Sequence, residues 1–163
     1  MMDVTQLGQL VDEHAAALTL YARQFCAAPE DVVQEAFVKL FKQEHTPSPA
    51  APWLFRVVRN AAISAARSEQ RRRRHEARAA QDTPAWFVAQ LDSALDAADV
   101  MAALKTLSAE QREAITLHLW GGLSFAEVAA VVESSPSSAH RTYAEGLRQL
   151  RERLNPCHPT NRT

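Results

Sequence analysis

The 163-residue sequence predicts an all-α fold of two small helical domains, and two observations carry this prediction. The hydrophobic content of 47% is built on Ala, Leu and Val with only four Gly, a composition that favours helices over sheets. Apolar residues recur at three- and four-residue steps in two groups of segments, which an acidic stretch of small residues separates. We therefore expect domains at 1–78 and 99–154, a flexible linker at 79–98 and a tail at 155–163.

Positive charge is concentrated in one segment of an otherwise acidic chain. The formal net charge is −1, but residues 51–78 hold eight Arg against two Glu, which gives +6. A basic segment of this kind indicates local contact with a polyanion. The first residues do not form a basic and apolar leader, no long apolar run is present, and Cys26 and Cys157 are too few for a disulfide framework. We therefore expect a soluble, cytoplasmic protein with free thiols.

Two amphipathic helices are expected before residue 45. The first runs from about Thr5 to Phe25, where apolar residues recur at helical steps. Pro29 and the two acids after it predict the start of the second helix, because Pro is tolerated in a first turn and acids there suit the helix dipole. This helix continues to Phe41. Its polar face is most simply exposed to solvent, and the alternative is a protein-docking surface made by Asp31, Gln34, Glu35 and Lys39.

A proline-rich loop at 45–52 precedes the third expected helix, which runs from about Trp53 to about Arg78. This helix is longer than its apolar stripe needs for core packing. A second face carries side chains that suit phosphates and bases, namely Arg56, Arg59, Asn60, Ser64, Arg67, Arg71 and Arg74. The aromatic residues Trp53 and Phe55 suit stacking on unpaired bases. The alternative is a solvated helix end, which is the commoner fate of a charge run.

Two short helices are expected after residue 107. Ser108 and Ser124 each open a capping box, with Gln or Glu three residues later. The pair Gly121–Gly122 ends the first of these helices.

A polar turn at 133–138 leads into a last helix that ends near Leu154, and Pro136 suits its first turn. A short helix, a tight turn and a longer helix are the plan of a helix-turn-helix, whose second helix enters the major groove of DNA. The alternative is a plain helical hairpin. The side chains that suit DNA contact on the last helix are Ser137, Ser138, His140, Arg141 and Arg148.

The sequence contains no persuasive catalytic or metal-binding constellation. We find no nucleophile beside a base, no paired catalytic carboxylates, no glycine-rich phosphate loop and no convincing zinc-ligand spacing. The six His are scattered, and His118 on an apolar helix face is most simply a packed core residue. We expect no enzymatic activity, no catalytic residue, no metal and no cofactor.

Four stretches of the chain resemble the extracytoplasmic-function sigma factors, the smallest members of the bacterial sigma-70 family. PEDVVQEAFVKLF at 29–41 is similar to region 2.2, and PWLFRVVRNAAISAARSEQRRRR at 52–74 is similar to regions 2.3 and 2.4. Residues 104–132 and 137–154 resemble region 4. Together these stretches span nearly the whole chain.

The resemblance implies a sigma region 2 helical bundle, a sigma region 4 helix-turn-helix, and a non-enzymatic function in transcription initiation. The polar face of the second helix would dock on the β′ clamp helices of core RNA polymerase. The third helix would open and read the minus-ten promoter element, with the loop at 45–52 capturing an unstacked base. Region 4 would read the minus-thirty-five element and touch the β flap. A separate anti-sigma factor is the default expectation for control, because the nine residues after Leu154 are too few for a sensing domain.

Region 4 departs from the family pattern at the helix-turn-helix corner and at the start of the recognition helix. Glu133 stands where the family usually has Gly, and His140, Arg141 and Thr142 stand where Lys and Arg usually begin the helix. Two alternatives therefore stay open. One is a stand-alone helix-turn-helix regulator that binds duplex DNA without polymerase, and the other is a sigma-like adaptor that has lost DNA contact.

Overall fold

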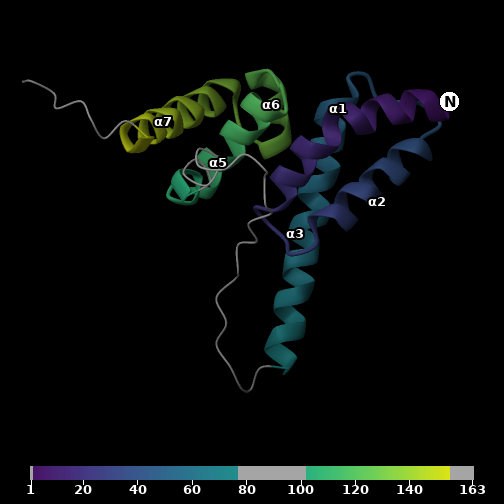
Figure 1. The fold of residues 1–163 in the computed structure, drawn as a ribbon, viewed down its shortest axis with the longest axis horizontal. Coiled ribbons are helices and arrows are strands. Elements are labelled where there is room, and N and C mark those ends of the chain that lie inside the picture. The colour runs from purple at the N-terminus through teal and green to yellow at the C-terminus, as the bar shows by residue number, and fades with distance from the viewer. Residues whose placement is uncertain (1, 77–101, 155–163) are drawn as a thin grey trace, which may run out of the picture.

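The computed structural model describes residues 2–76 and 102–154, and every regular element in these ranges is helical (Figure 1). This confirms the predicted all-α class. The predicted linker and tail lie outside the described residues, so the domain boundaries stay predictions. The N-terminal unit consists of three helices that pack against one another, α1 (Val4–Ala22), α2 (Pro29–Phe41) and α3 (Ala50–Glu76).

In the C-terminal unit, the first residues that the structure describes, 102–105, are helical. α5 and α6 both pack against α7, as a helix-turn-helix requires. The predicted capping boxes at Ser108 and Ser124 are both present. The elements that follow the first turn are α5 (Ala109–Ile115), the π-helical segment η1 (Thr116–Trp120), α6 (Phe125–Val132) and α7 (Pro136–Leu154).

Local chemistry explains where the N-terminal helices begin. Asp3 caps α1 through a capping box with Gln6, which places the first helical residue at Val4. Pro29 occupies the first turn of α2, as predicted. The predicted loop at 45–52 is too long, because α3 already begins at Ala50. Pro52 then lies in the first turn, where its missing N–H breaks no intrahelical hydrogen bond.

One apolar core runs from the N-terminal unit into the C-terminal unit. α6 packs on α3, and η1 packs on α1. The largest fully buried side chains therefore come from both units, and those in this common core are Leu18, Tyr21, Leu40, Leu54, Phe55, Val58, Leu117, Leu123, Val128 and Val131. A smaller core lies between α5, α7 and the first turn, around Leu104, Ile115 and Leu150.

α3 contributes to the core only through its N-terminal part. Its last buried residue is Ala62, and every side chain from 63 to 76 is exposed or half-buried. Figure 1 shows this C-terminal part projecting beyond α1 and α2. The fold thus holds a basic helix end away from the core.

Candidate nucleic-acid interface

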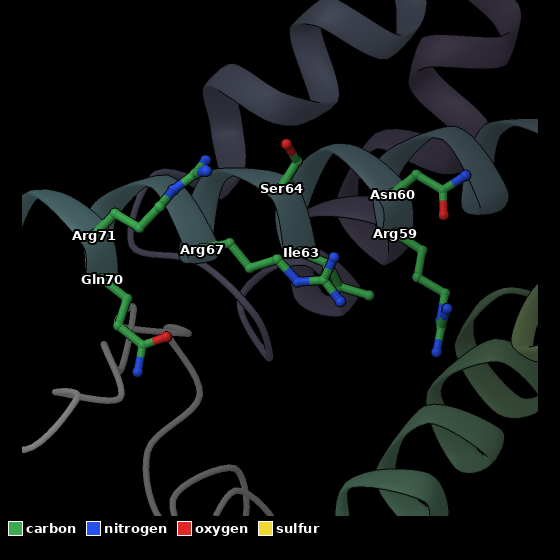
Figure 2. A pocket seen from close by; sticks show the side chains of 7 residues that line it. All are labelled: Arg59, Asn60, Ile63, Ser64, Arg67, Gln70 and Arg71. Atoms are coloured by element: carbon green, nitrogen blue, oxygen red, sulfur yellow. The ribbon is translucent and has the colours of Figure 1, made fainter.

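A groove of about 650 Å³ runs along the exposed part of α3. Its position follows from the helical period, because residues three and four apart lie on one face. Figure 2 shows side chains that project from successive turns of α3 along this groove. The residues that line it, among those that the structure describes, are Arg59, Asn60, Ile63, Ser64, Arg67, Gln70 and Arg71.

Five of the eight residues predicted to contact the minus-ten region line this groove, and Ile63 and Gln70 are additions. Arg74 is exposed further along the same helix. Trp53 is half-buried and packs against the core. The prediction that Phe55 stacks on bases is wrong for this arrangement. Its ring is fully buried, because it packs edge-on against Tyr21 with 5.5 Å between ring centroids.

Arg59 is paired with a carboxylate from the C-terminal unit. Its Nε donates to Oε2 of Glu113 at 2.9 Å, and the Tyr21 hydroxyl donates to the same oxygen at 3.0 Å. Burial alone would lower the pKa of Arg59, but the hydrogen bond and the negative charge of Glu113 outweigh it and raise that pKa. Burial, reinforced by Glu113, raises the pKa of Tyr21. No local sequence pattern indicates this pairing, because the partners are far apart along the chain.

The predicted docking face of α2 is exposed over its whole length. Asp31, Gln34, Glu35 and Lys39 all lie at the surface, and the Lys39 ammonium pairs with Glu35 at 2.7 Å. Sequence reasoning missed two exposed apolar side chains on this face. Val38 is 45% exposed and Phe41, the last residue of α2, is 42% exposed.

The steps from Asp31 to Gln34, Val38 and Phe41 are three, four and three residues, so these four form one stripe on α2. The face therefore combines an acidic end with an apolar end. Exposed large apolar side chains beside polar ones are typical of protein-binding surfaces.

The recognition helix α7 carries little free positive charge near its start. Ser138 donates its backbone N–H to the Ser135 hydroxyl, so it serves the helix start. Ser137, His140 and Arg141 are exposed, and the His140 ring packs edge-on against Phe125. These three of the predicted DNA-contact residues are thus accessible at the start of α7.

Arg148, further along α7, is held by two carboxylates of its own helix. It pairs with Glu145 at 2.6 Å and with Glu152 at 2.5 Å. Its charge is therefore partly neutralised before any phosphate arrives.

His118 is a packed residue, as predicted. Its Nδ1 lies 2.7 Å from the Leu123 carbonyl oxygen, and its ring stacks on Phe125 with 4.3 Å between centroids. Among residues 2–76 and 102–154, no cluster of three His, Cys, Asp or Glu is arranged to hold a metal ion. None of the described helices has the length and apolar character needed to cross a membrane.

Comparison with known proteins identifies the class. The family model for sigma-70 region 2 matches residues 10–72, and the model for sigma-70 region 4 matches residues 97–150. The chain is 33% identical over 150 residues to the ECF RNA polymerase sigma factor SigL of Mycobacterium tuberculosis, covering 87% of this chain and 85% of the relative. It is 29% identical to the RNA polymerase sigma factor CarQ of Myxococcus xanthus over 131 residues, 78% of this chain and 75% of CarQ.

Solved structures agree with this class. The sigma factor RpoE in complex with the anti-sigma factor NepR, from Bartonella quintana, has a TM-score of 0.71 at 27% identity, covering 95% of this chain and 100% of that one. CnrH in complex with the cytosolic domain of CnrY has a TM-score of 0.62 at 26% identity, with coverages of 96% and 92%. The chain belongs to the extracytoplasmic-function sigma factors of the sigma-70 family. It is an RNA polymerase sigma factor that acts in transcription initiation, and proteins of this family are generally not catalysts.

Proposed function

We propose that this sigma factor opens and reads the minus-ten promoter element through the groove on α3. The observation that supports this most strongly is a row of exposed arginines on a helix segment that the core does not need. Arg67, Arg71 and Arg74 neutralise backbone phosphates, and each phosphate contact releases counterions. Asn60 and Ser64 lie between the arginines and hydrogen-bond the edges of unpaired bases.

Promoter melting then follows from differential affinity. The groove binds unpaired bases better than it binds duplex DNA, so binding shifts the equilibrium towards the open form. The half-buried Trp53 at the start of α3 contributes to this part of the surface, and the loop at 45–49 captures an unstacked base.

The exposed face of α2, which is the stripe together with Glu35 and Lys39, is the proposed docking site for the β′ clamp helices of core RNA polymerase. Asp31, Gln34, Glu35 and Lys39 provide the polar contacts. Val38 and Phe41 provide apolar area that water covers in the isolated chain. A polar rim beside a small apolar centre is the usual composition of a protein interface.

Region 4 is proposed to meet the minus-thirty-five element through the start of α7, and the β flap on its other side. Ser137, Ser138, His140 and Arg141 lie at the DNA end of the helix, and Arg148 contacts phosphate only when it leaves its carboxylate partners. We therefore propose a weak minus-thirty-five contact. The catalytic chemistry belongs to the polymerase, the chain itself is not an enzyme, and it works in the cytoplasm.

An anti-sigma factor is a further proposed partner. RpoE resembles this chain over nearly its full length, and its structure was solved in complex with the anti-sigma factor NepR. That complex supports the proposal.

Two measurements test the proposed function together. A pull-down with purified core polymerase is expected to retain the chain, and run-off transcription from a candidate promoter is expected to depend on it. Binding to duplex DNA without any binding to core polymerase would instead favour a stand-alone regulator. Binding to core polymerase without initiation on any promoter would favour a sigma-like adaptor.

A further inference from the structure

A buried polar network joins the two helical units. Glu113 on α5 accepts hydrogen bonds from Arg59 on α3 and from Tyr21 on α1. Glu113 is only 7% exposed and Tyr21 is fully buried. Every bond of this network crosses from one unit to the other.

The burial of Glu113 makes the network sensitive to loss of either partner. A carboxylate removed from water needs compensating charge and hydrogen bonds, and here Arg59 and Tyr21 supply them. Without Arg59, a buried negative charge would remain unpaired. When the two units separate, Glu113 and Arg59 therefore both become exposed to water.

Further contacts surround the network. The Gln24 side-chain amide donates to the Thr116 hydroxyl at 2.8 Å, and Arg56 donates to the Ala130 carbonyl oxygen at 3.4 Å. Gly121 lies so close to the Phe55 ring that a Cβ there would be 2.9 Å from the nearest ring carbon. Polar and apolar contacts thus hold η1 and α6 against α1 and α3.

The same contacts occupy one end of the groove on α3. Figure 2 shows the Arg59 guanidinium pointing towards the helices of the C-terminal unit, whereas Ser64 points away from them. Arg59 is therefore both a groove residue and a residue held by Glu113. Arg67 and Arg71 remain exposed at the other end, so the closed chain still offers phosphate contacts there.

We propose that the C-terminal unit is an intramolecular competitor of promoter DNA, with the Glu113 carboxylate holding Arg59 in place of a DNA phosphate. In the closed chain, Arg59 is withheld from nucleic acid while the exposed arginines of α3 stay available. The whole groove becomes available to promoter DNA only when the two units separate. This inference rests on the proposed use of the α3 groove for promoter DNA.

A charge-neutral substitution at the network tests the competition. Glu113→Gln is compared with Glu110→Gln, which removes the same charge from an exposed position in the first turn of α5. Dyes on Asp12→Cys and Arg151→Cys report the separation of the units by energy transfer, in a chain with Cys26→Ser and Cys157→Ser.

Glu113→Gln is expected to lower the energy transfer and to tighten binding of a random-sequence single-stranded oligonucleotide. Its salt slope should steepen by about 0.7, because one released arginine adds about 0.7 on a single strand. Glu110→Gln is expected to leave both readouts near those of the parent. Adding Arg59→Ala to Glu113→Gln should remove the extra slope. Unchanged energy transfer and an unchanged slope in a folded Glu113→Gln chain would overturn the proposal.

A second experiment keeps the network intact and locks it. In the chain with Cys26→Ser and Cys157→Ser, Gln24→Cys and Thr116→Cys are joined by a short reducible thiol crosslinker. The crosslinked chain should lose run-off transcription with core polymerase and regain it after reduction. Full initiation by the crosslinked chain would overturn the competition. Failure of the parent chain to initiate would instead count against the proposed function, so the two failures are distinguishable.

Discussion

The guanidinium of Arg148 forms a bidentate pair with the carboxylate of Glu145 on the same helix. The distances are 2.6 Å between Nη2 and Oε1 and 3.0 Å between Nε and Oε2. A carboxylate in this fork-to-fork geometry occupies the donors that a DNA phosphate would use. Arg148 also donates to Glu152 at 2.5 Å. Contact between Arg148 and a DNA phosphate therefore has to displace an existing ion pair.

Releasing Arg148 should strengthen DNA binding by region 4. We expect Glu145→Gln with Glu152→Gln to steepen the salt slope for duplex DNA by about 0.9, because one further arginine becomes free to neutralise a phosphate. Fluorescence anisotropy with labelled duplex at several salt concentrations measures the slope. The control is Glu13→Gln with Glu110→Gln, which removes the same charge from exposed sites on α1 and α5. Equal slopes in the two variants would show that Arg148 does not meet DNA.

The pair of Arg148 and Glu145 predicts an unusually low pKa for Glu145. The hydrogen bond from Arg148, followed by that from Gln149, lowers the pKa of Glu145 from 4.5 to about 2. A lowered pKa in the folded state means that the stabilising contribution is complete above 4.5 and is lost as pH falls towards 2. Side-chain NMR of Glu145 should show a midpoint near 2 that rises towards 4.5 in Arg148→Ala. An ordinary midpoint in the parent would contradict the pairing.

The parts of the fold that could be predicted from the sequence depend on neighbours along the chain. The capping boxes at Ser108 and Ser124 act over three residues, and Pro29 acts within one turn, so the sequence contains all the information they need. The start of α3 was placed too late, because Pro52 marks either a loop or a first turn equally well. The π-helical segment before Gly121 follows from none of these local patterns.

The candidate site was predictable where it depends on one helix and not where it depends on two units. The arginine row on α3 follows from the helical period alone. The pairing of Arg59 with Glu113 depends on how α5 meets α3, and no local pattern contains that information. Phe55 was misassigned because its burial depends on tertiary contacts, with Tyr21 of α1 and with Gly121 of the C-terminal unit.

Removing the outer arginines should separate promoter opening from polymerase binding. We expect Arg67→Ala, Arg71→Ala and Arg74→Ala together to abolish opening, because three phosphate contacts are lost, while the stripe on α2 is untouched. Permanganate footprinting measures opening, and a pull-down measures binding to core polymerase.

The matched control for the outer arginines is Arg72→Ala with Arg73→Ala. Both of these residues pair with Glu69 on the same helix, so their charge is already partly neutralised. Unchanged opening in the triple variant would refute the assignment of the groove to promoter DNA.

Reversing charge on α2 should weaken polymerase binding and leave DNA binding unchanged. We expect Asp31→Arg with Glu35→Arg to weaken core polymerase binding by about tenfold or more, equal to about 1.4 kcal/mol, because two of the proposed polar contacts are then reversed in charge. Binding of the isolated chain to single-stranded DNA should not weaken. Surface plasmon resonance on immobilised core polymerase checks the first expectation. Asp12→Arg with Glu13→Arg on α1 is the control, and an equal loss there would point to a general effect of charge.

Glu133 carries backbone strain that a glycine would relieve. Its φ of 58° and ψ of 49° place it in the left-handed region at the end of α6, where a Cβ is unfavourable. We expect Glu133→Gly to raise the free energy of unfolding by up to about 1 kcal/mol, since the relief of strain is partly offset by the greater freedom of glycine in the unfolded chain. Calorimetry should show a rise in Tm of up to about 4 °C.

Glu133→Ala separates strain from charge at this corner. The alanine keeps the Cβ in the left-handed region but removes the carboxylate, which otherwise helps to raise the pKa of Arg59. If strain dominates, Glu133→Ala gains no stability and only Glu133→Gly does. If both variants instead lose stability equally, the electrostatic attraction between Glu133 and Arg59 outweighs the strain, and the carboxylate helps to keep the two units together.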